Sequence, residues 1–366
     1  MRELRDLRVL HASAATRWTR SAWPFAWVVL MTLTIGCSRN DAAGQDEESN
    51  ASRRAPAQRL VVYSGRTEGL IDPLFRRFEA QTGIPVQVRY GETASLAAAI
   101  LEEGPRSPAD VFVAQDASAI GALQGANRLA PLPAPLLERV RPSFRSTEGM
   151  WVGISGRARV LTYRPDRVRE DELPDTLTDL LHPRWQGRLG WAPTNASFQS
   201  MVTALVQLEG ADAAERWVRG ILALQPRAYP GNSPAVQAVL RGEVDAVLTN
   251  HYYLYRLQGE GVSTEQGRNH YLRGGDAGAM INVSAIGRLA TSRQSEAAER
   301  LIGFLLEEEQ QRFFVETNHE LPTAQGMHLP TGFPALESLA IPTLRFEDLS
   351  DLTQTHHILR RTGAMP

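Results

Sequence analysis

Short apolar runs alternate with helical patterns through the first third of the folded part of the chain. The stretches "RLVVYSG" (59–65), "IPVQVRYG" (84–91) and "ADVFVAQ" (109–115) have the length and composition of short buried strands. Between them, "LIDPLFRRFEAQTG" (70–83) and "SLAAAILEEG" (95–104) place apolar residues at helical spacing and end at a glycine. The order β-α-β-α-β predicts a parallel α/β sheet.

The same alternation continues to the end of the chain. Residues 157–164 ("RARVLTYR") and 243–250 ("EVDAVLTN") are predicted as strands, and 175–190 as a helix followed by a turn. Further helices are predicted over 197–210, 212–224 and 234–242, and one long amphipathic helix over 295–316. The region from about residue 59 to 366 exceeds one typical core, so two domains are expected.

Small polar residues collect where the predicted strands end and the helices begin. Ligands of open α/β sheets bind at the carboxyl ends of strands, so these stretches together predict one composite site. Each stretch alone would also fit an ordinary helix cap. The five stretches are "YSGRTE" (63–68), "AQDAS" (114–118), "APTNASF" (192–198), "PGNSPA" (230–235) and "TNHYYLY" (249–255).

The last of these stretches contains three tyrosines, Tyr252, Tyr253 and Tyr255. Phenols are oxygen ligands for a hard metal ion, and a bound cation can displace the proton of a phenol whose free pKa is about 10. Adjacent residues of a strand point to opposite faces, so both Tyr252 and Tyr253 can reach one ion only if the strand turns into a helix after Asn250. Tyr255 would then point away. The alternative is an aromatic cluster packed in the core.

The first 36 residues have the order of a secretory signal peptide. Residues 1–20 carry five arginines, and residues 21–36 are an uncharged stretch shorter than the roughly 20 residues of a membrane span. The stretch ends at Cys37, and "TIGC" is similar to a bacterial lipoprotein cleavage site, although Thr34 stands where such sites usually have leucine. We expect residues 1–36 to be removed and Cys37 to be lipidated. An uncleaved anchor or an unmodified cysteine is the alternative.

Residues 38–58 contain no large apolar side chain, so they cannot bury enough surface to fold. Segment 37–58 is therefore expected to be a lipid anchor and disordered tether, joining a membrane to a globular body outside the cytoplasm.

Composition limits the remaining functions. The net charge of −2 becomes more negative without residues 1–36, which argues against a nucleic-acid partner. The single cysteine excludes an internal disulfide. All lysine and arginine positions of the chain are arginines, so an arginine at any one position is weaker evidence for a binding site than usual. The sequence contains no Gly-x-Ser-x-Gly elbow, phosphate-binding loop or His-Glu-x-x-His motif, so we expect no enzyme activity.

Several stretches together resemble the ferric-iron-binding solute-binding proteins of bacterial ABC transporters. The resemblance implies a type II periplasmic-binding-protein fold: two lobes, each a mixed sheet flanked by helices, with the ligand cleft between them. It places residues 59–157 and about 283–333 in lobe 1, and about 158–282 and 334–366 in lobe 2. The stretches are "LVVYSGR", "PADVF", "WVGISGRARVLTY", "PRWQGRLGWAPTNASF", "NSPAVQAVLRGEVDAVLTNHYYLYR" and "DAGAMINVSAIG".

The resemblance also implies a ligand set. Tyr252 and Tyr253 match the family's adjacent iron ligands, whereas Thr67 and Gln115 stand where some members have His and Glu. The chain is therefore similar to the branch that uses tyrosines and a bound anion, here carbonate or phosphate. Gln115, Tyr255 and His251 are expected to be further ligands or to line the site. The anion is expected at Arg66, Arg157, Asn195, Ala196 (through its backbone N–H), Ser197, Asn232 and Asn250.

The function implied is capture of ferric iron and its delivery to an ABC permease and its ATPase. The protein is expected to act as a monomer, on the periplasmic or cell-surface side of a membrane. The alternative is the same fold with another cargo, such as an oxyanion, a phosphonate or a polyamine. The adjacent tyrosines distinguish the two, because an oxyanion site does not need them.

Overall fold

The computed structural model describes residues 59–327, 329 and 333–366. These residues belong to one compact unit, Arg54–Pro366. The predicted signal peptide, Cys37 and the tether lie outside the described residues. Within the described part of the chain, no helix combines the length and the apolar character needed to span a membrane.

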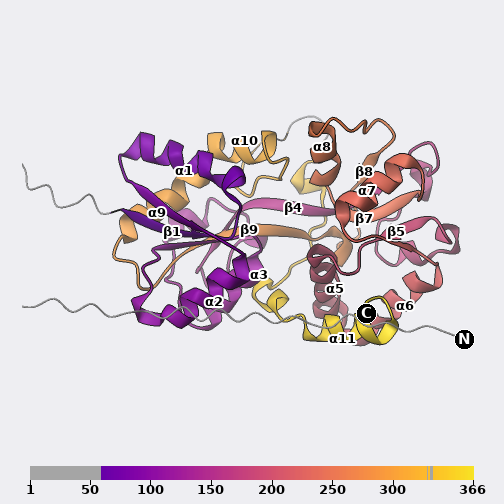
Figure 1. Ribbon diagram of the computed structural model, residues 1–366, viewed down its shortest axis with the longest axis horizontal. Helices are drawn as coiled ribbons and strands as arrows, with labels where there is room; N and C mark the ends of the chain where they lie inside the picture. The colour runs from indigo at the N-terminus through magenta and orange to yellow at the C-terminus, as the bar shows by residue number, and fades with distance from the viewer. Residues whose placement is uncertain (1–58, 328, 330–332) are drawn as a thin grey trace, which may run out of the picture. The chain divides into compact units, whose positions relative to one another are not determined.

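A mixed β-sheet of nine strands forms the centre of this unit (Figure 1). Its order is β2-β1-β3-β9-β4-β7-β5-β6, and β8 pairs with β4. β1 is parallel to β2 and β3, whereas β9 is antiparallel to both β3 and β4. The strands are β1 (Leu60–Ser64), β2 (Val86–Tyr90), β3 (Val111–Ala114), β4 (Val152–Tyr163), β5 (Leu189–Trp191), β6 (Arg227–Ala228), β7 (Ala246–Asn250), β8 (Arg268–His270) and β9 (Ile281–Arg288).

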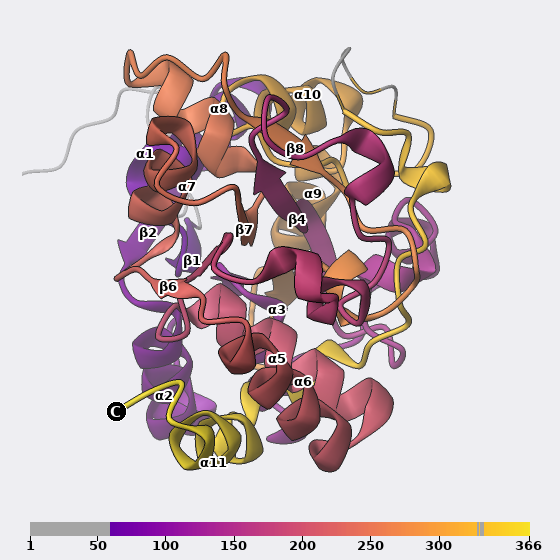
Figure 2. The same cartoon turned by 90° about the vertical axis from the view of Figure 1, so that its right-hand side faces the viewer.

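Helices cover both faces of the sheet. Near β1, α1, α9 and α10 lie on one side, with α2 and α3 on the other. Near β7, α7 and α8 lie opposite α5, α6 and α11 (Figure 1 and Figure 2). The helices are α1 (Glu68–Thr82), α2 (Thr93–Glu103), α3 (Ala117–Gly125), α4 (Ala134–Leu137), α5 (Ala196–Glu209), α6 (Ala211–Ala223), α7 (Asn232–Arg241), α8 (Tyr252–Gly259), α9 (Ser295–Leu305), α10 (Glu308–Glu316) and α11 (Thr353–Thr362).

The predicted opening β-α-β-α-β order is confirmed by β1, α1, β2, α2 and β3. The two long strands β4 and β9 pair with each other and join the β1 side of the sheet to the β7 side. Because β4 has twelve residues, it can contribute side chains to both halves of the sheet. The exact lobe boundaries stay a prediction.

The prediction of one long helix over 295–316 is wrong, because the chain breaks between α9 and α10 at Glu307, whose ψ of 151° is extended. The break lets both helices bury their apolar residues, Leu301 and Ile302 on α9 and Phe314 on α10. The Gln311 side chain offsets the lost helical bonding, since its Nε2 donates to the Leu305 carbonyl at 2.8 Å.

The helix predicted within 175–190 is also wrong. This region contains only two single 3-10 turns, Asp179–Leu181 and Pro183–Trp185, before β5. Pro183 has no N–H to continue a helix, and it restricts His182 to an extended conformation with ψ of 136°.

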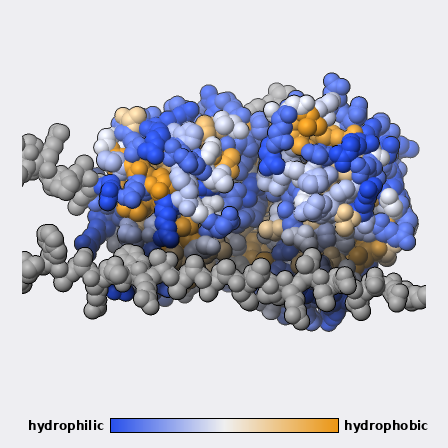
Figure 3. All heavy atoms as spheres, viewed as in Figure 1, coloured by the Kyte–Doolittle hydropathy of each residue, from blue (hydrophilic) through white to orange (hydrophobic). Residues whose placement is uncertain are grey.

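The C-terminal segment packs on helices that cover both halves of the sheet. The 3-10 helix η8 (Phe346–Ser350) packs on α3, where a Cβ at Gly121 would lie 2.5 Å from the Glu347 Cα. α11 packs on α5 and α6, and Thr355 on α11 hydrogen-bonds Thr203 on α5 at 2.7 Å. The face of the molecule in Figure 3 is mainly hydrophilic, and its hydrophobic residues form small separate patches.

Candidate metal and anion site

A polar stripe runs along the two long strands where they pass between the halves of the sheet. Ser155, Arg157 and Arg159 alternate along β4, so their side chains share one face. On β9, Ser284 pairs with Ser155, and Asn282 pairs with Arg157. All five residues are buried, so each must find a polar partner within the protein or in a ligand.

Arg66, which follows β1, is held at one end of this stripe. Its guanidinium makes a two-point ion pair with Glu320, at 2.9 Å and 3.3 Å. It also donates to the Ser284 and Ser155 hydroxyls, at 2.5 Å and 3.2 Å. Only 1% of Arg66 is exposed, so its charge is balanced inside the protein by one carboxylate.

Arg157, in the middle of the stripe, is balanced in a similar way. Its Nη2 donates to Asp116 at 2.7 Å and to the Gln115 carbonyl. Asn282 donates to the same Asp116 oxygen at 2.7 Å. Burial opposes the charge of Arg157, but the attraction of Asp116 and of neighbouring Tyr252 and Glu320 raises its pKa above the usual value.

Arg159, at the other end of the stripe, has no carboxylate partner among the described residues. Its Nη1 donates to the Ser197 hydroxyl at 3.0 Å and to the Asn250 side-chain oxygen at 3.1 Å. Its Nε and Nη2 are buried without a partner in the described part of the chain. Burial lowers the pKa of Arg159 to about 10, although Tyr253 and Tyr252 oppose the shift. An uncompensated buried charge of this kind is what a bound anion would stabilise.

The polar loop before α5 joins Arg159 to the start of α7. Asn195 caps α5 by accepting the Ser197 backbone N–H at 3.0 Å. Asn232, the first residue of α7, donates to the Asn195 and Ser197 side chains at 3.1 Å and 3.0 Å. Ala196 is the first residue of α5, so its N–H belongs to a helix start that favours anions.

The two adjacent tyrosines lie in the first turn of α8, directly after β7. The strand ends at Asn250 and the helix begins at Tyr252, as the sequence predicted. The rings of Tyr252 and Tyr253 stack with centroids 4.5 Å apart and planes inclined by 28°. Burial and the neighbouring Tyr253 raise the pKa of Tyr252, whereas Arg157 and Asn250 lower it. Both phenols act electrostatically on Arg159, and Tyr252 also acts on Arg157.

His251 directly precedes the two tyrosines in the chain, and its side chain hydrogen-bonds a backbone group. Its side chain is fully buried, and its Nδ1 accepts the Ala158 N–H at 3.1 Å. Tyr255 points away from the pair, because its ring stacks on Phe333 at 5.3 Å and lies 5.5 Å from the ring of His319.

The loop after β3 brings Gln115 beside Arg157. Its backbone carbonyl also accepts the Ser284 hydroxyl at 3.0 Å, and its side-chain Oε1 is buried without a partner in the described residues. Thr67 is exposed and makes no side-chain cap bond to α1. The described residues contain no group of three or more His, Cys, Asp or Glu side chains that could hold a metal ion. A metal at this site would therefore depend on the tyrosines.

Sequence reasoning missed three residues that the structure brings to this region: Arg159, Asp116 and Glu320. Arg159 had a signal, because Ser155, Arg157 and Arg159 recur every second residue in a strand that is otherwise mainly apolar. Asp116 lay inside one of the polar stretches. Nothing in the local sequence marks Glu320, which meets Arg66 across 254 positions.

Comparison with known proteins identifies the family. Residues 106–344 match the model for bacterial extracellular solute-binding proteins. The chain belongs to this family. It is 33% identical over 274 residues to the Fe(3+)-binding periplasmic protein of Serratia marcescens, covering 74% of this chain and 80% of that protein. The family binds solutes, so the expectation that the chain is not an enzyme is confirmed.

Solved structures confirm the predicted periplasmic-binding-protein fold. Iron-bound HitA from Pseudomonas aeruginosa superposes with a TM-score of 0.72 at 35% identity, covering 83% of this chain and 99% of that one. A Trichodesmium protein in complex with iron and citrate gives a TM-score of 0.74 at 27% identity, covering 84% and 99%.

Proposed function

We propose that this solute-binding protein carries ferric ion, with the phenol oxygens of Tyr252 and Tyr253 as its protein ligands. The observation that carries the proposal is the stacked pair in the first turn of α8, since two phenols side by side are a hard-oxygen donor set. The relative named for Fe(3+) binding and the iron-bound HitA structure support the same cargo.

An anion beside Arg159 completes the proposed coordination. Arg66 and Arg157 already face carboxylates, whereas Arg159 has two nitrogens without partners in the described residues. The Ser197 hydroxyl, the Asn250 side chain and the backbone N–H groups at the start of α5 lie around Arg159. Carbonate, phosphate or citrate offers the oxygen atoms that a planar guanidinium binds. The unpartnered Gln115 Oε1 is a further oxygen for the metal.

The test is a visible absorption titration of the chain from Ser38, metal-free, against a ferric chelate. Phenolate bound to ferric ion gives a charge-transfer band, so we expect a saturable colour at about one iron per protein. Tyr252→Phe and Tyr253→Phe should each weaken binding by more than about tenfold, because each removes a charged ligand.

Tyr229→Phe is the matched control, because Tyr229 is another half-buried tyrosine whose hydroxyl contacts Glu243 instead of the site. If Tyr252→Phe and Tyr253→Phe both bind iron as the wild-type protein does, the two tyrosines are not metal ligands. A colourless wild-type protein that binds an oxyanion would favour the alternative cargo, for which the unpaired Arg159 is the supporting observation.

The proposal also covers delivery of the iron to a permease and anchoring of the protein to a membrane. A solute-binding protein of this family passes its cargo to a membrane permease and its ATPase, and we propose that this chain does so as a monomer. Lipidation of Cys37 after removal of residues 1–36 would hold the body near that permease through segment 37–58. Replacing Cys37 with serine should release the protein from membranes into the soluble fraction without changing the iron titration.

A further inference from the structure

The C-terminal segment contacts two helices, α3 and α5, that cover different halves of the sheet. α3 packs on β3 and β9 in the half that contains β1 (the β1 half), whereas α5 packs on β7 in the other half (the β7 half). The 3-10 helix η8 contacts both α3 and α5. Figure 1 shows this segment in yellow below the two helices, on the side of the sheet away from α8 and α10. The chain therefore joins the two halves at a place other than β4 and β9.

The segment is bonded to α5 both before and after η8. Before it, Gln207 on α5 holds the backbone of Arg345: its Nε2 donates to the Arg345 carbonyl and its Oε1 accepts the Arg345 N–H, both at 3.1 Å. After it, the Thr355 hydroxyl donates to that of Thr203 at 2.7 Å, because the Thr203 proton goes to the Gln199 carbonyl. Two hydrogen bonds to one backbone residue fix the position of Arg345 along α5.

η8 meets α3 through its backbone. A Cβ at Gly121 on α3 would lie 2.5 Å from the Cα of Glu347, so only a glycine allows this approach. Beside it the buried Phe346 ring packs edge-on against Trp151, directly before β4, with centroids 6.1 Å apart. Leu349 is also buried. The contact with α3 is therefore close-packed.

Only two residues separate the bonds to α5 from the contact with α3. Gln207 holds Arg345, and Glu347 lies on Gly121. Two residues of fully extended chain span at most about 7 Å. On this side of the sheet, α3 and α5 therefore cannot move apart unless Gln207 loses both hydrogen bonds or Glu347 leaves α3.

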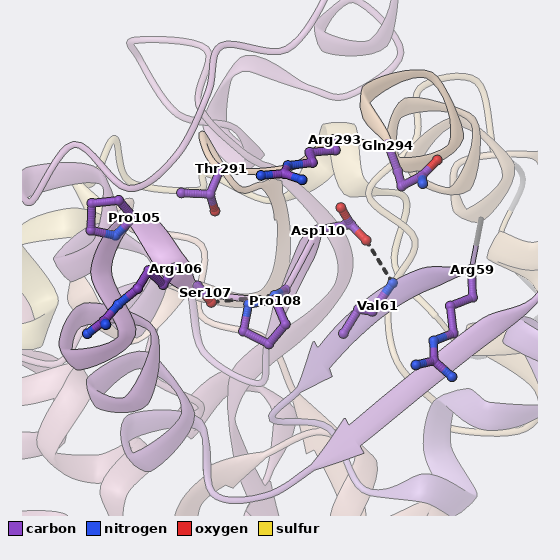
Figure 4. A pocket seen from close by; sticks show the side chains of 11 residues that line it. Arg59, Val61, Pro105, Arg106, Ser107, Pro108, Asp110, Thr291, Arg293 and Gln294 are labelled. Atoms are coloured by element: carbon purple, nitrogen blue, oxygen red, sulfur yellow. Dashed lines mark hydrogen bonds between the residues drawn. The ribbon is translucent and has the colours of Figure 1, made fainter. Parts of the chain in front are cut away.

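Each half is also held together internally, so movement between the halves has to take place at the links between them. In the β1 half, the buried Asp110 accepts the Val61 N–H at 2.9 Å, as Figure 4 shows, and the Ser292 hydroxyl at 2.7 Å. These bonds join β1 to the segments before β3 and before α9. In the β7 half, the bond between Thr203 and Thr355 joins α5 to α11.

α3 and α5 both begin at loops of the candidate metal and anion site. Asp116 directly precedes α3, and Asn195 directly precedes α5. Arg159 and Asn232 are buried within that site, so a ligand can reach them only when the surrounding groups separate. The separation of α3 and α5 therefore affects how far the site can open.

The opposite side of the sheet has a contact that can part without stretching the backbone. There the ring of Tyr255 on α8 lies 5.5 Å from the ring of His319, which follows α10. The two residues are far apart in the sequence, so no short piece of chain limits their separation.

We propose that residues 345–347 act as a strap that fixes the separation of α3 and α5, so that the two halves part only on the side of α8 and α10. The motion is then a rotation, with the strap and the β4–β9 pair at its axis. By limiting how far the site opens, the strap slows the release of iron. The effect on iron rests on the proposed function, whereas the effect on the two helices does not.

Distances between pairs of spin labels, measured by pulsed electron paramagnetic resonance, test the strap in the metal-free chain from Ser38, which contains no cysteine. Ala122→Cys on α3 and Leu208→Cys on α5 carry the labels of the strap pair. Gln258→Cys on α8 and Glu316→Cys on α10 carry those of the opposite pair. All four side chains are exposed. We expect a narrow distance distribution for the strap pair and a broad one for the opposite pair.

An insertion of two glycines between Arg345 and Phe346 keeps every side chain of the strap but adds up to about 7 Å of chain. It should broaden the distribution of the strap pair towards longer distances by up to that amount. The matched control inserts two glycines between Glu260 and Gly261, in an exposed turn after α8, and should leave the strap pair unchanged. Gln207→Met, which removes both hydrogen bonds to the strap without lengthening the chain, should broaden the same distribution.

A strap pair as broad as the opposite pair in the wild-type protein would overturn the proposal. So would a strap pair that neither the insertion nor Gln207→Met changes, or one that the control insertion changes equally.

Iron release to an excess of chelator, followed by the charge-transfer band, measures the effect on the site. The strap insertion should release iron about fivefold faster than wild type, because wider opening no longer breaks the two Gln207 hydrogen bonds. The control insertion should release iron at the wild-type rate. A wild-type protein without a charge-transfer band would count against the iron proposal alone, because the distance measurements need no metal.

Discussion

Three buried arginines near the tyrosine pair differ in what balances their charge. Glu320 faces Arg66 and Asp116 faces Arg157, whereas Arg159 meets only neutral oxygens. A buried charge without a counter-ion is costly, and a ligand that supplies the counter-ion recovers that free energy. The proposal of an anion at Arg159 therefore rests on the difference among the three, and not on the presence of arginine itself.

Replacing Arg159 with glutamine should weaken the dependence of iron loading on added bicarbonate, phosphate or citrate. We expect a loss of about tenfold or more in iron affinity at a fixed anion concentration, because one charge-assisted contact disappears. The charge-transfer titration at several anion concentrations measures both quantities. Arg66→Gln is the comparison: it should lower stability, through the unpaired Glu320, more than it changes the anion dependence.

The opposite result would contradict this prediction. If the anion dependence survives in Arg159→Gln and disappears in Arg66→Gln, the anion binds at Arg66, as the resemblance implies.

At the scale of elements, the break between α9 and α10 depends on one glutamine. The buried Gln311 side chain donates to the Leu305 and Ile154 carbonyls, both at 2.8 Å, and accepts the Thr323 and Ala324 N–H groups. Four buried backbone groups thus have one side chain as their partner. Its neighbour Gln310 is equally buried but makes only a 3.4 Å contact with Glu307.

Gln311→Met should lower the free energy of unfolding by about 2–5 kcal/mol, because it leaves several buried backbone groups without a partner. Gln310→Met should change that free energy by less than about 1 kcal/mol, since little bonding is lost. Urea denaturation of both variants measures the difference. Equal effects of the two substitutions would show that the hydrogen bonds of Gln311 do not stabilise the break.

At the scale of the whole molecule, His251 links the site to the stability of the fold. It joins the end of β7 to β4 by accepting the Ala158 N–H, and it packs between Tyr252, Tyr271 and Phe333. Burial lowers its pKa to about 4, with smaller opposing effects from Glu320 and the Ala158 N–H. In the unfolded chain the ordinary value is about 6.5.

The unfolded state therefore binds a proton that the folded state does not bind between about pH 6.5 and pH 4. Stability is fully present above the unfolded pKa and falls as the pH is lowered through this window, by up to about 3 kcal/mol for this group. Urea denaturation of the iron-free protein across this range measures the loss. His251→Asn keeps an acceptor but cannot take up a proton in this range, so its stability should fall less steeply.

The same slope in wild type and His251→Asn would assign the acid sensitivity to other groups.

The alternation of apolar runs and helical patterns was enough to determine the α/β class and the order of the first elements, whereas a helix after Asn250 was expected only as a condition for both tyrosines to reach one ion. These features depend on neighbours within a few residues, where periodicity and capping decide the structure. The adjacent tyrosines and the polar stretches before α5 and α7 were visible for the same reason.

Only the tertiary structure decided which charges meet. Glu320 reaches Arg66 across 254 positions, beside the bridge between Leu321 and Gly156 of β4. Arg159 meets Asn250 across 91 positions, because β4 pairs with β7. The break at Glu307 also had no local marker, since its missing helical bond is replaced by Gln311 in a buried setting. Sequence by itself determined which local elements and donor groups this protein has. The pairing of buried charges, on which the proposed anion position at Arg159 rests, exists only once distant strands lie side by side.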